Sequence, residues 1–209
     1  SLNSSKCRDF IDKFYTPRNM AIYCVDPTPF DNVEREITKQ FGNLKFPYEY
    51  NNREIPEIIA PFEKTINNNG HQAHTIIGSR IFGKYDDRRF ALFLLNNYIG
   101  GPCMNSRLNQ ELRERNGLVY TVDSSVGLMS NCGLFQIYFG CDSSNIAKCK
   151  KIIHRELDKL ANNTMKSSIF ERARRQYLGQ LHVSSDHKES RAIGLGKSLL
   201  YYNEIHDIE

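Results

Sequence analysis

The chain has 209 residues, of which 40% are hydrophobic and 25% charged, and its formal net charge is +4 at pH 7. This balance predicts one globular domain over residues 1–209 and excludes intrinsic disorder. The excess of basic residues is too small to favour nucleic acid as a partner, and no apolar run reaches the roughly 18 residues that a membrane span needs.

The cysteines indicate the cellular compartment in which the protein is found. They lie at irregular spacing, at positions 7, 24, 103, 132, 141 and 149, and contain no C-x-x-C pair. Free thiols are the simpler interpretation, and they predict a reducing, cytoplasmic location. The start of the chain lacks the apolar stretch of a signal peptide. Because the first residue is Ser rather than Met, we expect the chain to be a piece of a longer protein.

The N-terminal part predicts a helix, a strand and a second helix. Residues 1–16 contain an entry helix, whose apolar spacing stops before Pro17. The segment NMAIYCV, residues 19–25, predicts a strand that a proline-rich turn closes. In the helix that follows, Asp31 can cap the first turn and Gly42 ends the last one.

The middle of the chain begins with a connection and a strand. Residues 45–70 have no clean period and predict an extended surface connection, and residues 71–82 predict a strand. A long helix from Asp86 or Asp87 is broken at the Gly100–Gly101 pair. These patterns place one long helix directly after the strand.

Residues 105–160 add a hairpin and two helices. A helix over 105–115 ends at Gly117 and precedes two alternating strands, 118–126 and 133–141, which indicate an antiparallel hairpin. An apolar stripe predicts a helix over 145–160.

The C-terminal segment completes the fold class. Residues 167–204 are expected to be helical, with a break near 184–186. The order of elements predicts an α+β fold, a two-layer domain with helices packed on one face of a mainly antiparallel sheet.

The histidines raise the question of a metal site. In HQAH, residues 71–74, the two histidines face opposite sides of a strand and cannot share one ion. His182 and Asp186 are four apart on one helix face and make at most a half-site, because zinc needs three or four ligands. The pattern favours hydrogen-bonded surface residues, and the chain has no H-E-x-x-H or H-x-x-E-H.

Arg113 and Tyr120 lie on the two sides of a helix-to-strand corner at Gly117. A guanidinium and a phenol are hydrogen-bond donors of fixed geometry, so the pair is a candidate for binding an oxyanion. The alternative is structural: an arginine near a helix C-terminus and a tyrosine half-buried in a sheet. Without further context, the residues favour the structural interpretation.

Four blocks of the sequence carry a family resemblance. They are residues 14–44, LLNNYIGGPCMNSRLNQELRERNGLVYTVDSS (94–125), GLFQIYFGCD (133–142) and GLGKSLLYYNE (194–204). The chain resembles the M16 family of zinc metallopeptidases, in particular the C-terminal domain, which does not bind zinc, of single-unit bacterial members. The resemblance implies an upstream domain of similar fold that carries H-x-x-E-H and the zinc of the full-length enzyme. This chain would bind no metal and would be inactive alone.

The resemblance also implies roles for single residues. Arg113 and Tyr120 match the spacing of an arginine and a tyrosine that donate hydrogen bonds to the scissile carbonyl of a peptide substrate. A glycine-rich loop that handles substrate in the family would place Gly100, Gly101, Asn105 and Ser106 near the peptide, although the loop is short here. If the donors act in trans, a homodimer is expected. The alternative function is a structural or chaperoning module without chemistry.

Overall fold

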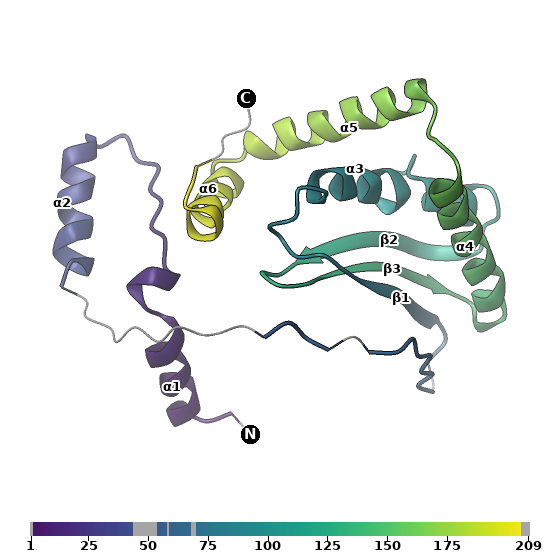
Figure 1. Ribbon diagram of the computed structural model, residues 1–209, viewed down its shortest axis with the longest axis horizontal. Helices are drawn as coiled ribbons and strands as arrows, with labels where there is room; N and C mark the ends of the chain where they lie inside the picture. The colour runs from purple at the N-terminus through teal and green to yellow at the C-terminus, as the bar shows by residue number, and fades with distance from the viewer. Residues whose placement is uncertain (1, 44–53, 58, 68–69, 206–209) are drawn as a thin grey trace. The chain divides into compact units, whose positions relative to one another are not determined.

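The computed structural model describes residues 2–43, 54–57, 59–67 and 70–205 (Figure 1). The chain divides into two compact units, and each is described by itself. One comprises Ser1–Asn52 together with Leu178–Glu209, and the other comprises Arg53–Tyr177. All six cysteines are free thiols. Among the described residues, no helix combines the length and the apolar character that a membrane crossing requires.

The first unit is helical. Helix α1 (Ser4–Phe14) begins where the Asn3 side chain accepts a hydrogen bond from the Lys6 backbone N–H at 2.9 Å. Helix α2 (Phe30–Phe41) ends at Gly42, as predicted. Asp31 does not cap this helix, which corrects the expectation: the N-cap is Pro29, and Asp31 lies in the first turn.

The structure contradicts the strand that the sequence predicts over residues 19–25. Pro17–Asn19 forms a 3-10 turn, and residues 20–25 have no strand assignment. Met20 is extended, with φ −125° and ψ 138°, so the backbone preference is realised locally. A strand also needs a neighbour for its N–H and C=O groups, and the sheet of the described residues contains three other strands.

The C-terminal helices follow the prediction more closely. Helix α5 (Ser167–Ser185) ends and helix α6 (Lys188–Tyr202) begins at the expected break. At its far end, α6 stops at Asn203, which has a positive φ of 56° and donates its backbone N–H to the Leu199 carbonyl.

The second unit contains an antiparallel sheet of β1 (Ala73–Ile81), β2 (Val119–Leu128) and β3 (Gly133–Cys141) in the order β1-β3-β2. The hairpin of β2 and β3 confirms the predicted pairing. Burial alternates around Val122 on β2, which is buried, whereas its neighbours Thr121 and Asp123 are exposed.

Helices α3 (Arg89–Gly100) and α4 (Ile146–Asn162), with the short helices η2 (Asn109–Glu114) and η3 (Ser143–Asn145), complete this unit. Figure 1 shows α3 lying along the sheet. The core that the helices and strands share centres on fully buried apolar side chains, namely Leu108, Leu112, Ile137, Phe139 and Ile153. The α+β class with helices on one sheet face is therefore observed.

Helix α3 begins slightly later than the sequence predicts. Asp86 precedes the helix, and its carboxylate accepts hydrogen bonds from the backbone N–H and the guanidinium of Arg88, the former at 2.9 Å. This local turn uses the aspartate that was expected to start the helix. The helix ends at the predicted glycine pair, with Gly101 as its C-cap.

Candidate functional site

The helix that carries Arg113 is wider than an α-helix. Asn109–Glu114 has π geometry, and the Arg115 N–H donates to the Gln110 carbonyl five residues earlier, at 3.0 Å. Single π turns of this kind are frequent at functional sites. The sequence predicted an ordinary helix here. The turn buries Leu112 completely, while Arg113 beside it is exposed.

A glycine corner joins this helix to the sheet. Gly117 has φ 57°, a backbone conformation that other residues rarely adopt, and a Cβ at this position would meet nothing within 4 Å. Glycine is therefore needed for its conformation rather than for space. The corner leads into Leu118 and Val119, both 7% exposed, which anchor the start of β2.

Tyr120 lies at a β-bulge. Val119 pairs with Cys141 and Thr121 pairs with Gly140, so Tyr120 is the extra residue of β2 at this point. A bulge of this kind can re-aim a side chain out of the regular alternation. The Tyr120 side chain is 55% exposed.

The Tyr120 hydroxyl donates a hydrogen bond to Asp142 Oδ1 at 2.8 Å. Asp142 directly follows β3, the strand that pairs with β2. The hydrogen bond to Asp142, and then the negative charge of its carboxylate, raise the pKa of Tyr120 above its ordinary value. The phenol is therefore a neutral donor at physiological pH.

Arg113 differs from Tyr120 in its contacts. Among the described residues, its side chain makes no hydrogen bond and no ion pair, and it is exposed. The two predicted donors thus come from one corner of the fold, on either side of residues 115–118. No hydrogen bond between described residues joins the two side chains.

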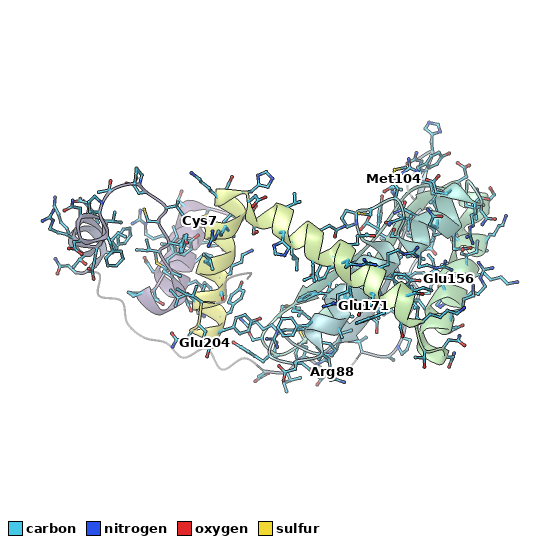
Figure 2. The ribbon with its side chains drawn as sticks, turned by 90° about the horizontal axis from the view of Figure 1, so that it is seen from above. Cys7, Arg88, Met104, Glu156, Glu171 and Glu204 are labelled. Carbon is cyan, nitrogen blue, oxygen red and sulfur yellow. The ribbon has the colours of Figure 1, made fainter. Side chains whose placement is uncertain are left out.

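A buried charge network lies beside the helix of Arg113. The carboxylates of Glu111 and Glu156 are 7% and 4% exposed, and they come from η2 and α4. Arg107 contacts both carboxylates, at 3.4 Å and 2.5 Å, and Arg155 contacts both at 3.2 Å. Lys159 adds a bond to Glu156 at 2.7 Å. Figure 2 labels Glu156 on α4. The network fastens the helix of Arg113 to α4.

Sequence reasoning missed this network, although it left one signal. Glu156 occupies a position between Ile153 and Leu160 on the apolar stripe of α4. A charged residue at such a position is buried with a partner or breaks the stripe. The partner Arg107 is 49 residues away in sequence, so the pattern alone could not identify it.

Glu156 makes the stability of the domain depend on pH. Burial raises the pKa of its carboxyl, but the hydrogen bonds from Lys159 and Arg107 outweigh burial and lower it from 4.5 to about 2. Because the folded state binds this proton less readily than the unfolded chain, the stabilisation is fully present above pH 4.5 and is lost as the pH falls towards 2.

We therefore expect the free energy of unfolding to fall between pH 4.5 and pH 2, and to fall less steeply in Glu156→Gln, which has no carboxyl to titrate. Urea unfolding at a series of pH values measures this. Parallel pH dependence in the wild type and the variant would contradict the assignment to Glu156.

The four predicted substrate-binding residues lie from the last residue of α3 to the segment before η2, and they have different surroundings. Gly100 and Gly101 are buried, and a Cβ on Gly100 would come within 2.6 Å of Ser124 Oγ on β2. Glycine is thus required there for close packing. Ser106 is buried and accepts a hydrogen bond from Asn109, whereas Asn105 is exposed. Contact of these residues with a peptide stays a prediction.

The histidines do not gather into a metal site in the described part of the chain. No group of three or more His, Cys, Asp or Glu side chains among those residues could hold an ion. His74 on β1 bonds instead to the Tyr138 hydroxyl at 2.8 Å. His182 lies on α5, and Asp186 directly follows the helix, with its backbone N–H donating to the His182 carbonyl at 3.2 Å. These residues do not fit a zinc centre.

Comparison with known proteins adds a family to this geometry. Residues 1–177 match the sequence model of the family described as "Peptidase M16 inactive domain". The chain is 31% identical over 218 residues to an uncharacterized zinc protease of Streptomyces coelicolor, covering 98% of this chain and 46% of that protein. It is 28% identical over 200 residues to the uncharacterized zinc protease YmxG of Bacillus subtilis, covering 96% and 48%.

Solved structures share the fold. A protease from Helicobacter pylori matches with a TM-score of 0.77 over 97% of this chain and 50% of that one, at 16% identity. A peptidase M16 inactive domain from Pseudomonas fluorescens matches with a TM-score of 0.55 over 63% and 31%, at 23% identity. The chain spans about half the length of the curated relatives it matches.

Proposed function

This chain belongs to the M16 peptidase family, as a domain of the inactive type, and we propose that it forms a wall of the substrate chamber of a zinc-dependent endopeptidase. In this role Arg113 and Tyr120 donate hydrogen bonds to the scissile carbonyl of a bound peptide. The observation that carries the proposal is the exposure of both donors at one corner of the fold. The network of Glu111 and Glu156 ties the helix of Arg113 to α4.

The two donors suit an oxyanion. As a peptide carbonyl becomes tetrahedral, its oxygen gains negative charge, and donors already held in place stabilise that charge more than they stabilise the ground state. Arg113 supplies a permanent positive charge and a fork of N–H groups. Tyr120 supplies a neutral O–H, which its raised pKa keeps protonated. Asn105 and Ser106, with the Gly100–Gly101 pair, are proposed to lie along the peptide.

In this proposal, another domain of the enzyme binds the metal. The curated relatives are called zinc proteases and are about twice as long as this chain, and the described residues here do not fit a zinc centre. We therefore place the zinc ligands in an upstream domain of the same protein. The donors of this chain reach that domain within one chain, or in a second copy if the protein is a homodimer.

Peptide cleavage by the full-length protein tests the function. The double variant Arg113→Ala/Tyr120→Phe is expected to lose nearly all turnover while it keeps the zinc content of the wild type. The matched control, Arg172→Ala/Tyr15→Phe, changes an exposed arginine on α5 and an exposed tyrosine beyond α1, and it should retain activity. Equal turnover of the two double variants would favour the alternative, a structural or chaperoning domain.

A further inference from the structure

The hydroxyl of Tyr120 is already occupied. A phenol has one proton to donate, and in this structure the proton points to Asp142 Oδ1, 2.8 Å away. Both residues are exposed, and they lie at adjacent ends of the paired strands β2 and β3. A carbonyl oxygen that receives this hydrogen bond must take it over from the carboxylate.

The Asp142 carboxylate is not used to cap the helix that follows it. Asp142 is the N-cap residue of η3, a position where an aspartate side chain usually accepts a hydrogen bond from the first turn. Its side chain makes no such capping bond. The carboxylate bonds instead to Tyr120, which itself stands out of the regular ladder at the bulge. The bulge thus brings the Tyr120 hydroxyl to a carboxylate that no capping bond occupies.

We infer that Asp142 is the positioning residue of Tyr120: it holds the phenol hydroxyl in place in the free enzyme and passes that hydrogen bond to the scissile carbonyl oxygen of the peptide. The inference rests on the proposed function of Tyr120. No proton is transferred in this exchange, because the phenol keeps its O–H bond throughout. The acceptor changes from the carboxylate to an oxygen whose negative charge grows during the reaction.

The surroundings of the phenol are consistent with this role. The groups that raise the pKa of Tyr120 are Asp142, through its hydrogen bond and then its charge, followed by burial and by the neighbouring Cys141 thiol. Cys141 is fully buried at the end of β3. Asp142 is therefore the largest influence on whether the phenol carries its proton.

Kinetics of the full-length enzyme on a peptide test the inference through a double-mutant cycle. Asp142→Asn is expected to lower kcat roughly tenfold, less than the loss of an oxyanion donor itself would, with little change in KM. In a Tyr120→Phe background the same substitution should have no further effect, because Asp142 acts only through the phenol. Asp158→Asn, an exposed aspartate on α4, is the matched control and should leave kcat unchanged.

A second measurement does not depend on activity. Tyrosine labelled with carbon-13 at Cζ reports phenol titration in the full-length protein, and the Tyr120 signal is identified by its loss in Tyr120→Phe. Asp142→Asn should lower the pKa of Tyr120, whereas Asp158→Asn should not change it.

The results distinguish the proposed function of Tyr120 from the positioning role of Asp142. Unchanged turnover in Tyr120→Phe would contradict the proposed function, and with it the catalytic purpose of Asp142. A normal loss in Tyr120→Phe, with an unshifted Tyr120 pKa in Asp142→Asn, would overturn the positioning role alone. So would a kcat effect of Asp142→Asn that is equally large in the Tyr120→Phe background.

Discussion

Replacing Arg113 by alanine is expected to lower kcat of the full-length enzyme about 100-fold, because removal of one oxyanion donor typically costs this much. KM should change little, since the guanidinium contacts an oxygen whose charge develops only in the transition state. Steady-state cleavage of a fluorogenic peptide over a range of substrate concentrations separates the two constants. Arg113→Lys should recover only part of the rate, because an ammonium lacks the fixed fork of a guanidinium.

The surroundings of Arg113 separate an effect on catalysis from an effect on folding. Its side chain is exposed and has no ion pair among the described residues, so the substitution removes no folding contact and should change the free energy of unfolding by less than about 0.5 kcal/mol. Arg172→Ala on α5 is the control for loss of an exposed positive charge. If Arg113→Ala cleaves peptide within twofold of Arg172→Ala, Arg113 is not an oxyanion donor.

Replacing Glu156 by alanine is expected to destabilise the domain by about 3–5 kcal/mol, the cost of removing one partner of a buried ion pair. The Glu156 side chain is 4% exposed and holds three cations, Arg107, Arg155 and Lys159. Without it, Arg107 remains partly buried with Glu111 alone. The shift of the urea midpoint, with an unchanged slope, measures the loss.

A surface ion pair provides the comparison for Glu156. Glu171 pairs with Arg174 at 3.1 Å on α5, and these side chains are 47% and 53% exposed. Exposed pairs of this kind contribute about 0–1 kcal/mol, so Glu171→Ala should hardly change the midpoint. Glu156→Gln, which retains size and hydrogen-bonding capacity, should be milder than Glu156→Ala. A loss from Glu156→Ala no larger than that from Glu171→Ala would show that the network contributes nothing to stability.

Local patterns predicted most of the elements and failed where distant residues decide. The hairpin of β2 and β3, the stripe of α4 and the break between α5 and α6 follow from alternation, apolar period and turn residues close together in sequence. The strand expected over 19–25 is absent because β propensity describes a fit to neighbouring strands and does not supply them. Local propensity thus predicts an element correctly only where the residues that pair with that element are also close in sequence.

The residues of the candidate site also divide into those that local sequence predicts and those that it does not. Arg113 and Tyr120 could be singled out from the block at 94–125 and the family resemblance it carries, although the residues alone favoured a structural interpretation. The π geometry of η2 was missed because a window read with a period of 3.6 cannot reveal one wider turn. The contact of Asp142 with Tyr120 and the two contacts that join Glu111 and Glu156 across the network were missed because they span 22 to 49 residues of sequence.

Because Tyr120 is the extra residue of a β-bulge, its function depends on the number of residues in this part of β2. Side chains of a strand alternate between two faces, so a shift of one residue reverses the face on which each one lies. Inserting one residue into β2 beside Tyr120 would therefore turn the phenol to the other face of the sheet, away from Asp142, even if every other side chain were kept. Gly117 is needed for its positive φ, and Leu118 and Val119 are buried. We therefore expect relatives that cleave peptides to agree in the spacing of the two donors and in the character of these three positions, and to vary at exposed positions such as Glu114.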